Sequence, residues 1–396
     1  MFPEFPLLGQ LENQLAALSE QQLRRKLREV QTPTAASLIV DGQPLTAFCS
    51  NDYLGLASDA RIVDALREGA SLYGAGSGAS HLISGHSVAH SKLETRLAEM
   101  QAQHLVNPRA LFFSTGYMAN LAVLTALAGK DAAIFSEALN HASLIDGARL
   151  SRAAVTIFSR DDLPALDRLL AASTASTKLV VTDSVFSMEG AIAPLPELLA
   201  LCERHQAWLV VDDAHGFGVL GEQGAGVLQH FGLRSPQLVY IGTLGKAAGV
   251  SGAFVAAHAT VIEWLVQRAR TYIYTTATPP AIAHALLASL HIIHGAEGAM
   301  RRQKLQAHIK QLHDELHLTR ARLLPSDTPI QAILIGANQP ALQAGDALRA
   351  KGLWVAAIRP PTVAKDTARL RVTLSAAHDS AQITQLATAI NDLECA

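Results

Sequence analysis

A lysine inside a glycine-rich segment is the most unusual chemical feature of the sequence. Lys246 and Thr243 follow the apolar stretch 237–242, and glycines at positions 242, 245, 249 and 252 keep the segment compact. The amine of such a lysine either extends along the surface to solvent or attacks the carbonyl carbon of a ligand. The segment alone leaves both alternatives open.

A carboxylate and a histidine follow a second apolar stretch. Asp212 ends the run 207–212, and His215 lies three residues later. If 207–212 is a strand of an open parallel sheet, its carboxyl end lies where such sheets bind ligands. A carboxylate removed from water there needs a cation, which is either an arginine of the protein or a charged group of a ligand.

Three further groups follow strand-like runs. The segment 112–120 (FFSTGYMAN) passes from a strand-like to a helical pattern, which places Gly116 and Tyr117 at a helix N-terminus, where backbone N–H groups bind anions such as phosphate. His141 follows the run 131–137, and Ser187 follows the run 178–186. Taken singly, each of these residues is more typical of a helix cap or a core contact.

Together the five groups fit one ligand, pyridoxal phosphate. That cofactor needs a lysine for its aldehyde, a carboxylate that keeps its pyridine nitrogen protonated, and hydrogen-bond donors for its phosphate. The protonated ring accepts the electrons of a carbanion at the α-carbon of an amino acid. The sequence therefore predicts an enzyme that uses this cofactor.

Two glycine patterns and a histidine pair offer weaker alternatives. GFGVLG (216–221) lies four residues beyond its strand and has no acidic residue about 20 positions later, which argues against a dinucleotide site. GAGSGA (74–79) has no strand before it. His86 and His90 could share a helix face, but without an apparent third ligand nearby we expect a structural role and no metal.

The elements that position these residues form two groups. Strands are predicted at 109–115, 153–159, 178–186, 207–215 and 237–243, alternating with helices, which is typical of a mostly parallel sheet covered on both faces. After Pro279 and Pro280 one long helical stretch (281–318) precedes short strands at 330–336, 354–361 and 368–376 and a helix at 340–351, as in a small α+β domain. Leucines at helical spacing predict an amphipathic helix over 11–30.

Composition excludes several classes of protein. Hydrophobic residues make up 49% and charged residues 17% of the 396 residues, which excludes a disordered chain. A net charge of −2 disfavours a nucleic-acid partner. Three cysteines, no long apolar run and no signal-like N-terminus indicate a cytoplasmic protein without a disulfide framework or membrane segment.

The motifs resemble those of the α-oxoamine synthases, which condense an amino acid with an acyl thioester and release carbon dioxide. The resemblance runs from about residue 20 to 380 and rests on SNDYLGL (50–56), GSGASHLISG (76–85), FFSTGYMAN, NHAS, FSMEG, DDAHGFG, GTLGKAAGVSGA and IRPPTV. It implies the fold type I of pyridoxal-phosphate enzymes: a large domain with a mostly parallel seven-stranded sheet between helices, and a small α+β C-terminal domain. We expect an N-terminal segment (1–45), the large domain (46–282) and the small domain (283–396).

The resemblance also implies residue roles in cofactor binding. Lys246 would bind the aldehyde and move the α-proton, Asp212 would hold the pyridine nitrogen, and His141 would stack on the ring. The remaining cofactor contacts would come from His215 at the phenolic oxygen, Ser187 near that side of the ring, Gly116, Tyr117 and Thr243 at the phosphate, and Thr275 and Thr276 at the phosphate of a neighbouring subunit.

Substrate contacts follow from the same resemblance. Arg359 would bind the carboxylate of the amino acid, with Asn51 and Thr362 on the substrate side and Arg24 near the entry of the acyl group. The motifs are nearest to members that join L-alanine to a pimeloyl thioester in biotin synthesis, carried on coenzyme A or on an acyl carrier protein. A homodimer with sites at the interface is expected. The alternatives are a sister enzyme that uses glycine or serine and, more remotely, a non-catalytic partner subunit.

Four positions, at three places in the chain, depart from the family pattern. Ala364 and Asp366 stand where members usually have proline and glycine, Glu137 replaces an aspartate, and His81 replaces an arginine or glycine. None of these positions carries a predicted catalytic group, so we expect effects on loop shape or substrate preference.

Overall fold

The computed structural model describes residues 6–395 of the chain. Its largest sheet has seven strands in the order β3-β9-β8-β7-β6-β4-β5. All neighbouring pairs are parallel except those made by β9, which confirms the predicted mostly parallel sheet. The strands are β3 (Pro108–Phe113), β4 (Ala132–Glu137), β5 (Ala154–Phe158), β6 (Thr177–Asp183), β7 (Trp208–Asp212), β8 (Leu238–Thr243) and β9 (Ala253–His258).

Both faces of this sheet are buried under helices. Val180 and Val211 belong to one buried apolar cluster, whereas their neighbours Val181 and Val210 belong to another, because successive side chains of a strand point to opposite faces. This burial explains the uninterrupted apolar runs of the strands. The helices of this region are α2 (Ala60–Tyr73), α3 (Val88–Met100), α4 (Gly116–Leu127), α5 (Ala142–Ser151), α6 (Leu163–Ala172), α7 (Leu195–Arg204), α8 (Val227–Phe231), α9 (Ala259–Arg268) and α10 (Arg270–Ile273), with the π-helical turn η1 (His81–Gly85).

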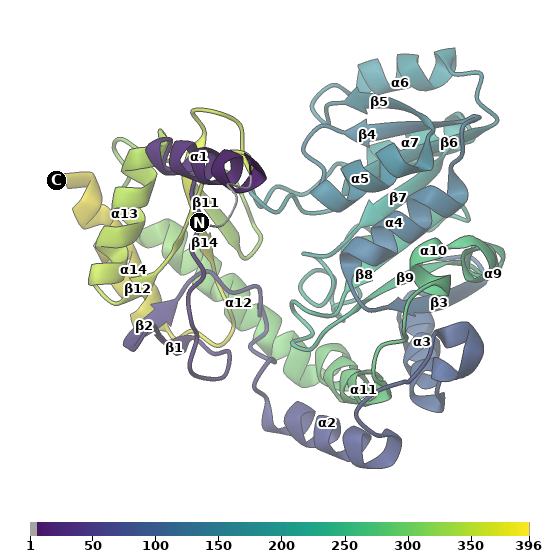
Figure 1. Cartoon of the computed structure of the whole chain (residues 1–396), viewed down its shortest axis with the longest axis horizontal. Helices are drawn as coiled ribbons and strands as arrows, with labels where there is room; N and C mark the ends of the chain where they lie inside the picture. Colours follow the sequence, from purple (N-terminus) through teal and green to yellow (C-terminus); the bar gives the residue numbers. More distant parts are fainter. Residues whose placement is uncertain (1–5, 396) are drawn as a thin grey trace.

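A second region lies beside the first, and α12 runs between them (Figure 1). It contains the antiparallel sheet β10-β11-β14-β13 and a three-stranded sheet in which β12 pairs with β2. The N-terminal strands therefore share a sheet with residues 353–354; the predicted boundaries at 45 and 282 stay a prediction. The elements are β1 (Ser37–Val40), β2 (Gln43–Ala47), β10 (Arg322–Leu323), β11 (Ile330–Gly336), β12 (Leu353–Trp354), β13 (Ala356–Ile358), β14 (Ala368–Thr373), α13 (Asn338–Ala350) and α14 (Ser380–Cys395).

Two predicted helices differ in length from those observed. The stretch 281–318 forms two helices, α11 (Pro280–His294) and α12 (Ala296–Glu315), which are separated at Gly295. The N-terminal helix α1 (Pro6–Glu20) ends ten residues earlier than predicted, because Gln22 adopts a left-handed conformation (φ 58°) and the N–H groups of Leu23 and Arg24 return to the carbonyl of Leu18. None of the described helices is both long and apolar enough to span a membrane.

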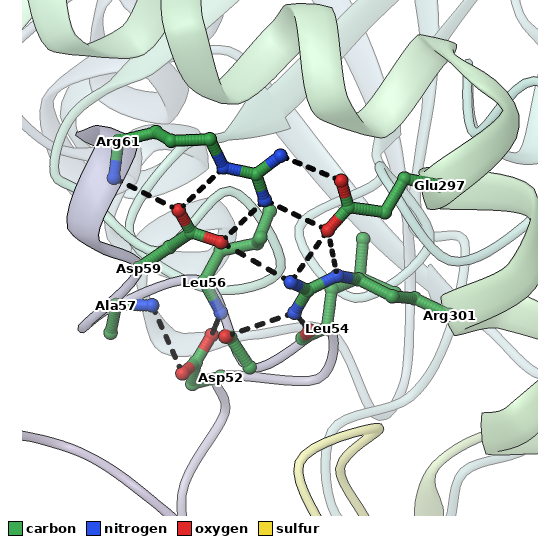
Figure 2. Close-up of polar contacts among 9 residues, drawn as sticks. Asp52, Leu54, Leu56, Ala57, Asp59, Arg61, Glu297 and Arg301 are labelled. Carbon is green, nitrogen blue, oxygen red and sulfur yellow. Dashed lines mark hydrogen bonds and ion pairs between the residues drawn. The ribbon is translucent and has the colours of Figure 1, made fainter. Parts of the chain in front are cut away.

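An ion-pair network joins the segment before α2 to the first turns of α12 (Figure 2). Arg301 donates to the carbonyl oxygens of Leu54 and Gly55 at 2.8 and 3.2 Å and pairs with Asp59 and Glu297. On the other side of this network, Asp52 accepts the N–H groups of Leu56 and Ala57. The network fixes the backbone of residues 52–59, and this segment also contributes Tyr53 to the site described next.

Candidate active site

A cavity of about 390 Å³ opens at the carboxyl edge of the large sheet. Because β6, β7 and β8 are parallel, their last residues, Asp183, Asp212 and Thr243, reach the same edge. This edge is where open parallel sheets bind ligands. The predicted site residues that line the cavity are Asn51, Gly116, Tyr117, His141, Ser187, Asp212, His215, Thr243 and Lys246.

Lys246 lies at one side of the cavity in contact with His215. Its Nζ is 3.1 Å from His215 Nε2, and His215 Nδ1 is 2.5 Å from the hydroxyl of Tyr53. Burial lowers the pKa of Lys246 because it disfavours the charged ammonium, and the charge of Arg371 lowers it further, although Asp212 and Asp183 oppose both effects. Burial, and then Lys246 and Arg371, hold the pKa of His215 well below its usual value. The lysine amine is therefore closer to its nucleophilic, neutral form than a surface lysine is.

Asp212 is a buried carboxylate held by neutral donors. Its two oxygens accept hydrogen bonds from Asn120 Nδ2 at 2.6 Å and from the N–H of Ala214 at 2.9 Å. Among the described residues no arginine or lysine forms an ion pair with it, so the simpler alternative of an internal arginine partner does not hold. A cationic ring nitrogen of a ligand would supply the missing positive charge.

A second buried carboxylate, Asp183, lies close to Asp212. Burial raises its pKa well above the usual range, and the charge of Asp212 raises it further. Its Oδ2 accepts the backbone N–H of His141 at 2.7 Å, which fixes the start of α5 beside the cavity. Asp183 thereby fixes the backbone of His141, whose imidazole the family resemblance would place on the ring face of the cofactor.

His141 caps α5 at the mouth of the cavity. Its Nδ1 is 2.7 Å from Ser143 Oγ and accepts the N–H of Ser143, so the ring orientation is set by the helix that it caps. Burial lowers the pKa of His141, which favours a neutral ring. A neutral imidazole can stack on an aromatic cation without charge repulsion.

The N-terminus of α4 also lines the cavity. Thr115 caps the helix by accepting the N–H of Met118 at 3.2 Å, and Gly116 is the first helical residue. A Cβ at position 116 would lie 2.8 Å from the Thr243 methyl group, so a larger residue would displace the Thr243 side chain. Free backbone N–H groups at a helix start bind phosphate.

Sequence reasoning missed Arg371 and Tyr53 as site residues. Arg371 on β14 donates from both terminal nitrogens to Asn51 Oδ1, at 3.3 and 3.2 Å, and from Nε to the carbonyl of Ser187. It therefore joins the small region to two residues that line the cavity. The sequence held a signal for each residue. Arg369 and Arg371 interrupt a mostly apolar predicted strand, and Tyr53 lies within SNDYLGL, one of the motifs that carry the family resemblance.

Five predicted residues lie outside the cavity lining. Arg359 donates to the carbonyl of Gln22, and Thr362 accepts from Arg25 at 3.4 Å, so the IRPPTV loop contacts the segment after α1. Arg24 is an exposed residue of that segment. Thr275 and Thr276 lie between α10 and α11. The roles assigned to these residues stay predictions.

The geometry fits pyridoxal phosphate. The cavity brings together an amine for the aldehyde, a buried carboxylate without a cationic partner and a helix N-terminus that begins with glycine, which are the three requirements derived from the sequence. Glu137, the longer replacement noted above, is buried beside this site and accepts the N–H groups of Leu139 and Arg160. Its extra methylene is thus used in holding the loop before His141.

Comparison with known proteins places the fold and the site in one class. The model of the aminotransferase class I and II family matches residues 43–390, and the chain belongs to this family. A variant of serine palmitoyltransferase from S. paucimobilis, solved with bound PLP and myriocin, is similar with a TM-score of 0.90 and 28% identity over 98% of both chains. These findings confirm the predicted fold and pyridoxal phosphate as the cofactor.

Two further matches have a more particular name. A relative from Janthinobacterium sp. (strain Marseille), named 8-amino-7-oxononanoate synthase, is 66% identical over 388 residues, 98% of each chain. A solved 8-amino-7-oxononanoate synthase from Francisella tularensis is similar with a TM-score of 0.73 and 31% identity, over 88% of this chain and 97% of that one.

Proposed function

We propose that the protein condenses L-alanine with a pimeloyl thioester to form 8-amino-7-oxononanoate, carbon dioxide and a free thiol, a step of biotin synthesis. The observation that carries the proposal is the 66% identity, over 98% of both chains, to a relative with that name. The cavity supports it, because Lys246, His215 and Asp212 are all in place for chemistry at the α-carbon of an amino acid.

Each side chain of the cavity has a task in this reaction. Pyridoxal phosphate, when bound, supplies an electron sink for the carbanion formed at the α-carbon. Lys246 would hold the aldehyde, and its neutral amine would take the α-proton of the amino acid. Asp212, held by Asn120, would keep the ring nitrogen protonated. His215, held by Tyr53, would serve the phenolic oxygen, and the N-terminus of α4 with Thr243 would hold the phosphate.

The carboxylate of alanine requires a cation near Lys246. The resemblance gives this role to Arg359, which contacts Gln22 outside the cavity lining, and Arg359 stays the candidate. Arg371, which contacts the cavity-lining residues Asn51 and Ser187, is a second candidate. A guanidinium presents two parallel N–H donors to a carboxylate. Thr362 stays a candidate on the substrate side, and Arg24 at the entry of the acyl group.

The test is the mass of the product formed from pimeloyl-coenzyme A with L-alanine, glycine or L-serine in separate reactions. We expect the decarboxylated nine-carbon aminoketone with alanine alone. Lys246→Ala should abolish it, whereas Lys130→Ala, at an exposed position, should not. A product with glycine or serine in place of alanine would move the protein to a sister activity, and no product with any of them would contradict the proposal.

Two features of the active assembly belong to the same proposal. We expect a homodimer, because Thr275 and Thr276 lie outside their own cavity and α1 exposes five leucines: Leu7, Leu8, Leu11, Leu15 and Leu18. The exposed basic residues Arg24, Arg25, Lys26 and Arg28 suit an acidic acyl carrier protein as the donor. Light scattering of the purified protein tests the first expectation, and turnover with pimeloyl-coenzyme A against the carrier-bound thioester tests the second.

A further inference from the structure

Three histidines cluster outside the active-site cavity. His81 lies in η1, His90 lies in α3, and His86 lies between the two elements. Their ring centres are 4.9, 5.2 and 5.4 Å apart, and one nitrogen of each ring lies within 4.8 Å of the others. The sequence showed only the pair 86 and 90; the fold brings His81 to them as a third ligand candidate. We propose that this cluster is a binding site for a zinc-like transition-metal ion.

The ring separations suit a tetrahedral metal. Three imidazoles bound to zinc at about 2.0–2.1 Å have their ring centres about 5 Å apart, as these rings have. The Nδ1 atoms of His81 and His86 are 3.0 Å apart, close to the ~3.3 Å that separates two nitrogens on one tetrahedral zinc. The rings therefore need little movement to face a common ion.

The outer nitrogens of two rings already have partners of the kind found around metal sites. His90 Nε2 donates to the carbonyl of Thr278 at 2.8 Å, and His86 Nε2 is 3.0 Å from Ser91 Oγ. Glu94 Oε2 lies 3.9 Å from the same His86 nitrogen. Metal-bound histidines almost always donate their second nitrogen to a carbonyl, a carboxylate or a polar neighbour. A His86 ring that donates from Nε2 to Ser91 carries its lone pair on Nδ1, toward His81.

Existing hydrogen bonds compete with the metal: His81 Nδ1 and His86 Nδ1 are hydrogen-bonded to each other, and Ser87 Oγ lies 3.3 Å from His90 Nδ1. His90 Nδ1 accepts the N–H of Ser87 at 3.0 Å, as part of the cap of α3. Binding would exchange that hydrogen bond for a metal bond. Ser87 is only half-buried, so water can satisfy its N–H afterwards.

The cluster can be reached from solvent at His86, the exposed member of the three. Glu94 lies beside it, with Oε2 3.9 Å from His86 Nε2. A cavity of about 550 Å³ lined by His86, Ser91 and Glu94 gives access and room for a water ligand.

Three imidazole nitrogens select zinc, cobalt or nickel over magnesium and calcium, which prefer oxygen ligands. The ion would link η1 to α3. Through His90 it would also hold Thr278, whose hydroxyl is 2.8 Å from that of Ser114, a residue of the active-site wall. The geometry thus gives the metal a stabilising role beside the active site, without contact to the reacting atoms.

The experiment titrates Co²⁺ and Zn²⁺ into full-length, cofactor-loaded protein after removal of metals by a chelator. We expect one Co²⁺ per chain with the visible bands of a tetrahedral ion, and a rise in melting temperature with Zn²⁺. His86→Gln, at the most exposed of the three positions, should weaken binding at least tenfold. His291→Gln, at an exposed position on α11, should bind as the wild type does.

The proposal would be overturned by the absence of Co²⁺ binding at micromolar metal, or by equal binding by the wild type and by a folded His86→Gln variant. Binding that Lys246→Ala abolishes would place the ion in the active-site cavity and would likewise refute it. Should His86→Gln fail to fold, His81→Gln with the same titration replaces it. Turnover of alanine and pimeloyl-coenzyme A in the same samples keeps a failure of the metal site separate from a failure of the proposed function.

Discussion

At the scale of single residues, the site depends on charges that are shifted by burial. Lys246, His215 and Asp183 titrate away from their usual values because the cavity removes them from water, and each also feels the charges around it. Neutral partners such as Asn120 and Tyr53 orient these groups without adding charge. The consequence is a lysine whose reactivity depends on the nearby arginine as well as on its own burial.

Replacement of that arginine should change the pH dependence of cofactor attachment. Arg371 lowers the pKa of Lys246, so Arg371→Gln should raise it toward its ordinary value of about 10.4. Because only the neutral amine attacks the aldehyde, attachment of pyridoxal phosphate to the cofactor-free variant should be slower at pH 7–8 and recover at higher pH. The measurement is the attachment rate, followed by absorbance, across that pH range.

Arg369→Gln is the matched control for this substitution. Arg369 lies on the same strand and is equally buried, but it pairs with Glu189 and does not influence the pKa of Lys246. Its pH profile should follow that of the wild type. Superimposable profiles for Arg371→Gln and the wild type would show that the arginine does not control the lysine.

At the scale of elements, the departures from the family pattern have local structural causes. Asp366 lies in the loop before β14 with φ 62°, a left-handed conformation that favours glycine. Its side chain is exposed, so nothing in the loop requires an aspartate. The family's usual glycine at this position is explained by the backbone alone.

Asp366→Gly should therefore stabilise the protein. Relief of the left-handed strain is worth about 1–2 kcal/mol, and the greater freedom of glycine in the unfolded chain offsets about 0.4–1 kcal/mol of it. We expect a net gain of about 0.5–1 kcal/mol in the free energy of unfolding, measured by urea denaturation. Asp366→Ala keeps the Cβ but loses the tolerance of aspartate for this conformation, so it should be destabilising. A higher free energy of unfolding for Asp366→Ala than for Asp366→Gly would contradict the explanation.

At the scale of the whole molecule, the site is assembled from both regions. The large sheet supplies Lys246 and Asp212, β14 of the small region supplies Arg371, and the segment before α2 supplies Asn51 and Tyr53. The network in Figure 2 holds this last segment against α12, which runs between the regions. Stability and activity are therefore coupled at this junction.

Arg301→Met should lower both the stability and the activity of the protein. The substitution keeps the aliphatic part of the side chain but leaves the carbonyls of Leu54 and Gly55 without their donor, at a cost of about 2–3 kcal/mol in the free energy of unfolding. Residual activity, measured where the variant is fully folded, should also fall because the neighbouring Tyr53 loses its fixed position. Arg67→Met removes an exposed pair with Asp64 and should change stability by about 0.5 kcal/mol or less. Equal effects of the two variants would refute the role of the network.

The local pattern of apolar and polar residues was enough to predict most of the fold and the residues of the site that directly follow strands. Apolar runs predicted the strands of the large sheet except β9, which no predicted run covered. Parallel sheets bind ligands at their carboxyl edge, and this rule was enough to group Lys246, Asp212, His215 and Thr243, which line one cavity. The rule succeeds because each of these side chains closely follows its own strand, so the strand positions it.

The tertiary structure decided what the chain brings together over long distances. Arg371 reaches the site from another sheet, and Tyr53 reaches His215 across 162 positions. Over a short span, the π-helical turn η1 sets where His81 lies relative to His86 and His90. The end of α1 at Glu20 and the break at Gly295 likewise followed from backbone hydrogen bonds that leucine spacing does not encode. The sequence determines which chemical groups are available and which strand ends present them; which groups meet depends on the packing of separate elements, whose contacts carry no local periodic signal.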